Sequence, residues 1–475
     1  MDYLIMLPEI ILILFGILVL MLGLFIGSKK WLAYVLLAGL ASSLYFTSCI
    51  GCFEGLNIDS KVFDFFKQSY LVDGIVFYGR FLLLVVGILV VLASVEFFSK
   101  EKFQAEYYFF ISMAITGAMV MISANDLMVL FIGLELVALP GYVMVSLYRN
   151  AEGTEASFKY LIQGLAASAI MVFGMSIIYG VSGTTNYFQI ITSMPFKIED
   201  MILAPMLFIG LAFVFAGLGF KVAAFPFHFW APDVYESGPI PAVTFIAVVP
   251  KIAGFLALLR LFGGTFGISG YTYPVFFYFL AVASMTFGNF AALAQNNVRR
   301  MLAYSSIAQA GYMLIPLAVG TKDAYSGLMF YILVYALSNL GAFMVIIGCC
   351  GKNKGELSEF RNLSKRSPFL AFSMAVFLFS LAGIPPFAGF FGKLYLFSSA
   401  VTGGFLSLAL IGVLTSVVSL GYYFKVIKEM YFEETEEVSE IEIPSSLFAA
   451  LCFTFSLVFF LFILQGSILP FTYIF

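Results

Sequence analysis

The sequence has 475 residues, of which 62% are hydrophobic and only 11% are charged, whereas a soluble domain is about half apolar and roughly a quarter charged. Such a chain cannot cover its surface with polar groups, so the composition excludes a soluble globular protein and predicts an integral membrane protein. The net charge of −3, from 24 basic and 27 acidic residues, gives no electrostatic reason to expect nucleic acid as a partner.

The chain opens with an apolar segment from Leu4 to Phe25. Asp2 precedes this segment and Pro8 and Glu9 lie within it, in place of the basic lead and small-residue cleavage site of a signal peptide. We therefore expect the segment to be retained as the first membrane span.

Apolar segments of about 20 residues, the length that crosses a bilayer core of ~30 Å, recur along the entire chain. They predict fourteen transmembrane helices and no separate soluble domain. The expected fold class is an all-α integral membrane protein with a single polytopic domain over residues 1–475. The predicted spans are centred on Gly16, Gly39, Val85, Ile115, Leu136, Ser168, Leu211, Lys251, Ser284, Gln309, Val334, Leu381, Thr415 and Leu457.

The basic residues between the spans predict the orientation. If the N-terminus faces outward, fourteen basic residues lie on inward connections and five on outward ones. Basic residues concentrate on the cytoplasmic side, so we expect a protein of the bacterial inner (plasma) membrane with both termini in the periplasm. The inward set is Lys29, Lys30, Lys100, Lys102, Arg149, Arg299, Arg300, Lys352, Lys354, Arg361, Lys365, Arg366, Lys425 and Lys428, and the outward set is Lys61, Lys67, Lys197, Arg260 and Lys322.

The cysteines give little sign of metal or redox chemistry. Of the five, only Cys49 and Cys52 have the spacing of a metal or redox site, and the chain has no second such pair and a single histidine. We interpret the cysteines as small apolar side chains and expect no metal bound by this chain.

Five basic residues fall inside predicted spans, where a charge is costly. They are Arg80, Lys159, Lys221, Lys251 and Lys393. Arg80 lies early in its span and Lys159 follows a polar loop, so each side chain can extend its charge to the headgroup region. For Lys159 a functional role is an equally open alternative.

Lys251 is too deep for that explanation. The apolar segments Val243 to Pro250 and Ile252 to Leu259 flank it, which places it about ten residues, or ~15 Å, from either end of the span. An isolated ammonium at this depth costs roughly 3 kcal/mol, so a partner or water must reach it. Pro250 leaves the carbonyl of Ile246 without its helical donor, which loosens the helix at this point. We predict a functional role for Lys251.

Glu135 lies at a similar depth in the span from Leu127 to Leu147, with Pro140 little more than one turn further on. A carboxylate buried there needs a cation or a proton. The structural alternative to a role in proton transfer is a permanent salt bridge that fastens two helices.

The segments around Lys221 and Lys393 share a design. Gly217 to His228 and Gly383 to Lys393 each place a lysine beside glycine and proline in a hydrophobic stretch of nearly 30 residues. This pattern predicts a broken helix in each stretch. Paired broken helices in two halves of a chain are typical of transporters with a site near the membrane midplane.

His228 follows Lys221 by seven residues and would lie on nearly the same face if the helix continued. An imidazole changes its charge near neutral pH, so a proton relay to Lys221 is one interpretation. A packed histidine at the membrane edge is the other.

At these residues the sequence closely resembles the antiporter-like subunits of respiratory complex I and of the multisubunit sodium/proton antiporters, over nearly the whole chain. The most specific segments are the Glu135 helix, Lys221 to Tyr235 (KVAAFPFHFWAPDVY), the Pro250-Lys251 helix, Arg299 to Gly311 (RRMLAYSSIAQAG) and the turn from Leu381 to Lys393. The opening Leu7 to Leu12, and a lysine rather than a glutamate at position 393, favour one membrane subunit of the respiratory NADH-quinone oxidoreductase. Its subunit M and the D-type antiporter subunit, which also has a lysine in the last broken helix, remain alternatives.

The resemblance implies two inverted five-helix repeats, at about residues 107–262 and 273–431. It also implies a proton relay in which Glu135 modulates Lys221, Lys251 passes the proton laterally and Lys393 delivers it outward, with Lys159 as an auxiliary group. The chemistry is reasonable, because a lysine beside a carboxylate favours its charged form and the same lysine alone in an apolar site favours the neutral form.

The resemblance further implies a subunit without redox cofactors of its own, driven by quinone chemistry elsewhere in the complex. The sequence contains no Gly-rich phosphate loop, flavin fingerprint or cluster-ligating cysteine set. We therefore expect flavin, iron-sulfur clusters and quinone in partner subunits. The expected partners of this chain are other membrane subunits, the lipid bilayer and protons.

A monovalent cation/proton antiporter subunit is the main alternative function. A carrier of dehydrated cations should gather carboxylates and carbonyls, whereas the central charges here are mostly lysines, which suit protons. A purely structural scaffold is a third possibility, and it predicts that neutralising the central charges leaves transport intact.

Overall fold

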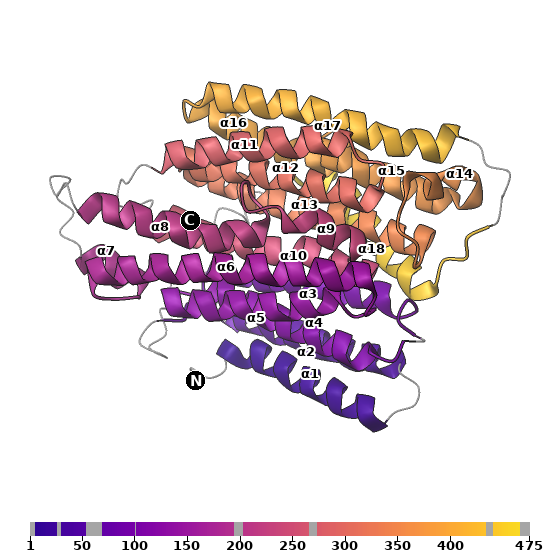
Figure 1. Cartoon of the computed structure of the whole chain (residues 1–475), viewed down its shortest axis with the longest axis horizontal. Coiled ribbons are helices and arrows are strands. Elements are labelled where there is room, and N and C mark those ends of the chain that lie inside the picture. The colour runs from indigo at the N-terminus through magenta and orange to yellow at the C-terminus, as the bar shows by residue number, and fades with distance from the viewer. Residues whose placement is uncertain are drawn as a thin grey trace.

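The computed structural model describes residues 5–25, 30–53, 69–99, 101–193, 203–265, 273–433 and 440–465, and it is a bundle of helices that lie side by side (Figure 1). Both chain ends and the side chain of Cys52, on which predictions were made above, lie outside the described residues.

The first part of the chain forms one edge of the bundle (Figure 1). Its helices are α1 (Leu7–Phe25), α2 (Lys30–Phe53), α3 (Gly74–Ser94), α4 (Gln104–Ser123), α5 (Leu127–Val145) and α6 (Ala151–Ser182). The middle part consists of α7 (Tyr187–Ser193), α8 (Leu203–Val222), α9 (Trp230–Ser237), α10 (Ile240–Leu258), the π-helical η2 (Leu259–Thr265), α11 (Pro274–Leu293), α12 (Val298–Val319) and α13 (Lys322–Cys350). The last part consists of η3 (Leu357–Phe360), α14 (Leu363–Arg366), α15 (Pro368–Ala382), α16 (Ala388–Thr402), α17 (Leu406–Phe432) and α18 (Ser445–Ile463).

Within the described ranges, 13 helices are long and apolar enough to cross a membrane, and they coincide with thirteen of the fourteen predicted spans. The remaining span, predicted around Leu381, is divided between α15 and α16, of 15 residues each. At ~1.5 Å per residue each is shorter than a bilayer core. The all-α membrane fold and the broken helix at this position are therefore confirmed.

Polar side chains cap the starts of many helices. Asp73, Asp126, Asn150, Asn297 and Thr321 each accept a hydrogen bond from a backbone N–H in the first turn of α3, α5, α6, α12 and α13 respectively. These N–H groups have no partner within their helix. The caps therefore explain where the sequence begins each of these spans.

The core of the bundle is α10, which packs against α3, α4, α8 and α13. All 19 of its residues are buried, whereas α1 and α17 lie at opposite edges of the bundle (Figure 1). In turn, α13 packs against α15 and α16. Each predicted repeat region contains one broken helix, α8–α9 or α15–α16, and the inverted relation between the two regions stays a prediction.

Candidate functional site: a series of buried ionisable groups

Lys221 lies at the end of the first broken helix. α8 ends at Val222, and the next residue, Ala223, has a φ of 55°, a left-handed conformation that stops an α-helix of L-residues. Trp230, the first residue of α9, donates its indole N–H to the carbonyl of Phe220 over 2.9 Å, so the second half-helix satisfies the end of the first. The Lys221 side chain is 1% exposed, and its Nζ has no hydrogen-bond partner among the described residues.

Glu135 lies on α5 and faces α6, where the hydroxyl of Ser168 donates a hydrogen bond to its carboxylate. Among the described residues no basic side chain forms a salt bridge with Glu135, although Lys221 is close enough to interact with its charge. The two groups are thus neighbours without direct contact. A permanent salt bridge between them, the structural alternative raised by the sequence, is not present.

His228 lies in the turn between α8 and α9, so the continuous helix that would have put it on the face of Lys221 is not present. The helix ends before it, and its imidazole packs against aromatic rings instead. The ring centroid lies 5.4 Å from that of Phe225, 4.5 Å from that of Phe229 and 4.6 Å from that of Phe287. Of the two interpretations, the structure agrees with a packed histidine. The role of His228 in a proton relay stays a prediction.

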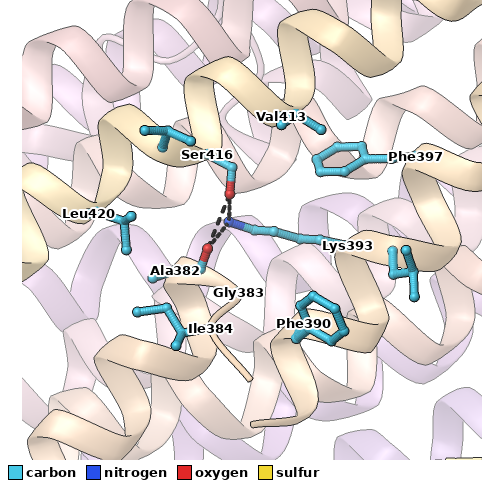
Figure 2. Close-up of a pocket in the computed structure, with 11 residues that line it drawn as sticks. Ala382, Gly383, Ile384, Phe390, Lys393, Phe397, Val413, Ser416 and Leu420 are labelled. Atoms are coloured by element: carbon cyan, nitrogen blue, oxygen red, sulfur yellow. Dashed lines mark hydrogen bonds between the residues drawn. The ribbon is translucent and has the colours of Figure 1, made fainter. Parts of the chain in front are cut away.

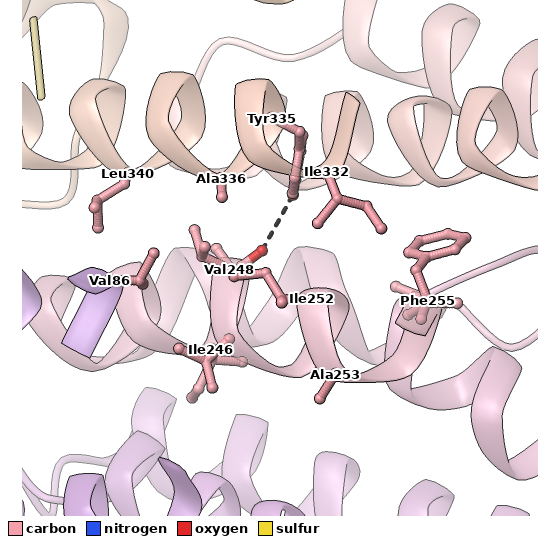
Figure 3. Packing of buried hydrophobic residues seen from close by; sticks show 14 of the residues in the cluster. Val86, Ile246, Val248, Ile252, Ala253, Phe255, Ile332, Tyr335, Ala336 and Leu340 are labelled. Atoms are coloured by element: carbon pink, nitrogen blue, oxygen red, sulfur yellow. Dashed lines mark hydrogen bonds between the residues drawn. The ribbon is translucent and has the colours of Figure 1, made fainter. Parts of the chain in front are cut away.

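Lys251 lies in the middle of the buried helix α10. Its Nζ donates to the backbone carbonyl of Ser306 on α12 and lies 5.5 Å from the centre of the Tyr335 ring on α13, a distance at which a ring face attracts a cation. The Tyr335 hydroxyl donates to the carbonyl of Ala247, one turn before Lys251 (3.1 Å; Figure 3). The turn that Pro250 loosens is therefore tied to α13.

Apolar side chains enclose this part of α10. Val248 and Ile252 lie towards α13, where Ile332 faces them (Figure 3). Lys251 itself is 1% exposed. Lys251 is thus buried within the bundle, and its partner is a carbonyl rather than a carboxylate.

Lys393 reaches from α16 to the end of α15. Its Nζ donates to the carbonyl of Ala382 (2.9 Å) and to the hydroxyl of Ser416 on α17 (2.7 Å; Figure 2), and it lies 4.7 Å from the centre of the Tyr312 ring. Ala382 is the last residue of α15, so the ammonium faces the negative end of that helix dipole. The side chain borders a cavity of about 280 Å³ whose other lining residues include Gly383.

The two halves of this second broken helix are in backbone contact. The N–H of Gly389, in the first turn of α16, lies 3.3 Å from the hydroxyl of Ser380 and donates to it. A Cβ added at Gly389 would lie 1.7 Å from the Ser380 carbonyl oxygen, so only glycine fits at this crossing.

Polar groups on α12 connect the surroundings of Lys251 to those of Lys393. Ser306, Gln309 and Tyr312 are spaced by three residues and so share one face of the helix. The first binds Lys251 and the last packs against Lys393. Gln309 lies between them and hydrogen-bonds to three other helices.

This polar series was not among the site residues predicted from the sequence. Its signal was visible, because Ser306 and Gln309 stand three residues apart within an otherwise largely apolar helix. Their segment, Arg299 to Gly311, was used only as evidence of resemblance.

Lys159 belongs to an exposed ion-pair network instead. Its side chain is 46% exposed and lies 2.8 Å from Glu155 and 3.1 Å from Asp233. Asp233 also pairs with Arg300 (3.2 Å), which in turn pairs with Glu236 (2.6 Å). The lysine extends to the surface, as one of the two interpretations expected, and its auxiliary role stays a prediction.

Two arginines correct the sequence analysis. Arg80 does not extend to the headgroups: it is 1% exposed and pairs with Glu9 of α1 at 2.6 Å, because a buried guanidinium needs a counter-charge. Arg260, assigned to an outward connection, is also buried, in η2, and pairs with Asp73 at 2.8 Å.

The ionisable groups follow one another across the bundle. Lys221 lies on α8, and α8 packs against α10, which carries Lys251. α10 packs against α13, and α13 packs against α16, which carries Lys393. Three buried lysines on neighbouring helices, two of them held by carbonyl or hydroxyl groups and none by a carboxylate within ion-pair distance among the described residues, are typical of a membrane subunit of the antiporter-like class.

Comparison with known proteins agrees with this class. A family described as NADH:quinone oxidoreductase/Mrp antiporter, TM, matches residues 124–419. The NADH-quinone oxidoreductase subunit N of Trichlorobacter lovleyi is 40% identical over 91% of this chain and 88% of its own length. The subunit N of Paramagnetospirillum magneticum is 38% identical over 94% of this chain and 92% of its own. The chain therefore belongs to the NADH-quinone oxidoreductase subunit N family, as Leu7 to Leu12 and Lys393 indicated.

Solved structures show the same fold. A chain of respiratory complex I from Thermus thermophilus with bound aureothin has a TM-score of 0.84 and 30% identity, with 98% of each chain covered. A chain of the Mrp complex from Dietzia sp. DQ12-45-1b has a TM-score of 0.86 at 20% identity, with 98% of this chain and 96% of that chain covered.

Proposed function

We propose that this chain is a proton-translocating membrane subunit of an NADH-quinone oxidoreductase, in which quinone reduction in partner subunits drives protons through Glu135, Lys221, Lys251 and Lys393. Membership of the subunit N family supports the assignment to this enzyme. The three buried lysines on adjoining helices, with the half-buried Glu135 on α5, support the transport role.

The observation that carries the proposal is the environment of Lys251. Its ammonium is held by the neutral carbonyl of Ser306 and faces the ring of Tyr335, and the described residues place no carboxylate within ion-pair distance. Loss of a proton from an ion-paired lysine would leave an uncompensated carboxylate in a low-dielectric interior. Loss of a proton from Lys251 leaves only neutral groups, so this lysine can alternate between two protonation states.

The two other lysines differ in how firmly they are held. Lys221 has no hydrogen-bond partner of its own, whereas Lys393 has two acceptors at the end of α15. In this scheme Lys221 takes a proton from the inward side under the influence of Glu135. Lys251 passes it towards α12, and Lys393 releases it outward when its two acceptors move away.

Redox chemistry belongs to other chains in this proposal. The described part of the chain contains no group of three or more His, Cys, Asp or Glu side chains that could hold a metal ion. Flavin, iron-sulfur clusters and the reacting quinone are assigned to partner subunits. The protein works in the plasma membrane with its termini in the periplasm.

Replacement of Lys251 in the assembled complex tests the proposal. The complex with Lys251→Met, reconstituted in liposomes, should assemble normally and lose most of its quinone-dependent proton uptake per assembled complex. Lys354→Met is the matched control, because that lysine is 65% exposed in a surface pair with Glu152; it should pump normally.

Two results would overturn the proposal. Normal pumping by the Lys251→Met complex would leave the lysine without a transport role and favour a scaffold. Pumping that requires sodium or potassium ions would favour the cation/proton antiporter.

A further inference from the structure

Gln309 connects the polar series on α12 to three other helices. Its Nε2 donates to the carbonyl of Leu381 on α15 (3.0 Å) and, over 3.4 Å, to the hydroxyl of Tyr423 on α17. Its Oε1 accepts from the hydroxyl of Tyr331 on α13. The side chain is fully buried, and one amide thus connects four helices.

The Gln309 amide is linked to Lys393 through the carbonyl of Leu381 on α15. Leu381 and Ala382 are the last two residues of α15, and their carbonyls have no helical donor beyond them because the helix breaks at Gly383. Gln309 binds the first carbonyl and Lys393 the second. The amide therefore fixes the peptide group that stands next to the acceptor of the lysine.

Only one orientation of the amide satisfies these neighbours. A carbonyl oxygen can only accept, so the NH₂ group must face Leu381, and the amide oxygen is then left for the phenol of Tyr331. A carboxylate in this place would direct an acceptor at an acceptor, and an apolar side chain would leave a buried carbonyl unpaired.

We propose that Gln309 is a positioning residue for proton transfer between Lys251 and Lys393: it holds the end of α15 in the geometry in which Lys393 meets its two acceptors. The inference rests on the proposed function, because it assigns a role in the same proton path. Gln309 itself takes no proton, since an amide does not ionise at accessible pH.

The test uses an isosteric change that makes the contact depend on pH. In the Gln309→Glu complex the new carboxyl group can donate to Leu381 only while it is protonated. Pumping relative to wild type should therefore be close to normal at low pH and fall as the pH rises through the titration of that carboxyl. Gln309→Leu, which cannot donate at any pH, should lower pumping per assembled complex about tenfold throughout.

Titratable groups that are already present near Gln309 also affect the pH dependence of pumping. The titratable groups that face Gln309, or stand beside it in the polar series, are Lys251, Tyr312, Tyr331, Tyr335, Lys393 and Tyr423. They are present in wild type and in both variants, so pumping is compared with wild type at each pH. Gln309→Leu adds no charge, so its loss reports the missing donor alone, and the Gln309→Glu profile is read beside it. Gln295→Glu is the control, because Gln295 donates to the carbonyl of Ala291 at the end of α11, outside the polar series.

The outcomes separate this inference from the proposed function. If Lys251→Met abolishes pumping while Gln309→Leu pumps within twofold of wild type, or while the Gln309→Glu ratio is flat across pH, the positioning role is refuted and the relay stands. If Lys251→Met itself pumps normally, the relay and the inference fail together. Equal pH dependence in the Gln295→Glu control would also refute a specific role for Gln309.

Discussion

The ion pair between Glu9 and Arg80 gives a quantitative test of how the first helices are held. Both side chains are almost fully buried, at 2% and 1% exposure, with Arg80 2.6 Å from the Glu9 carboxylate. The Tyr70 hydroxyl donates to Glu9 over 2.8 Å and accepts from Arg80 over 2.6 Å. Removal of one partner from a buried pair costs about 3–5 kcal/mol, because the remaining charge is uncompensated.

The two single replacements should differ. Glu9→Gln leaves a guanidinium that cannot lose its proton. We therefore expect this variant to lose stability by close to the upper value, about 5 kcal/mol. Arg80→Met leaves a carboxyl group that can take up a proton and become neutral, so the loss should be smaller, and smaller still at acidic pH. The double replacement removes both charges and should lie close to wild type.

The assay is thermal denaturation of the purified complex, followed by the fraction of this chain that remains assembled, at neutral and acidic pH. A double-mutant cycle then gives the coupling energy. Lys428→Met is the surface control, since its side chain is 65% exposed in a pair with Glu433, and it should leave the midpoint unchanged. The reasoning is refuted if the double variant is less stable than both single variants, or if Glu9→Gln is harmless.

Three further predictions concern the proposed path and the orientation. Glu135→Gln should lower pumping more than it lowers the amount of assembled complex, because the amide keeps the volume and the Ser168 contact but removes the charge near Lys221; equal losses would indicate a structural role. Lys251→Arg should fail about as badly as Lys251→Ala, because guanidinium keeps its proton; near-normal pumping by the assembled Arg variant would leave Lys251 as a fixed charge. Single cysteines introduced between Lys352 and Arg366 should resist an impermeant thiol reagent added to intact cells, and labelling from outside would reverse the topology.

The fold could be predicted because lipid imposes a simple pattern on sequence. A span needs about 20 apolar residues. Each predicted centre except one lies in a long helix of its own. The exception, at Leu381, was visible as a break because Gly383, Pro385 and Pro386 interrupt the apolar run directly after it. Composition and local residue types sufficed for these features.

The partners of the buried charges could not be predicted in the same way. Arg80 pairs with a residue 71 positions earlier in the chain, and no local pattern indicates which of two helices will meet. The sequence therefore suggested the headgroups, the nearest polar region, as its destination. Gln309 is a similar case, because its three partners come from α13, α15 and α17 and depend on how the helices pack.

His228 shows a third limit. Its spacing from Lys221 predicted a shared face only for a continuous helix, and the same segment was predicted to be broken. The break at Ala223 separates the two side chains, so the stronger local signal, proline and glycine in an apolar stretch, overrode helical periodicity.

The backbone contact between Gly389 and Ser380 has a mechanical consequence. With the first turn of α16 resting directly on the last turn of α15, no side chain lies between them to yield by changing rotamer, and close-packed interiors shift between discrete arrangements rather than deform continuously. The two half-helices therefore meet at a contact that cannot be compressed. A motion that separates Lys393 from its acceptors, Ala382 and Ser416, has to pivot at this crossing or break it.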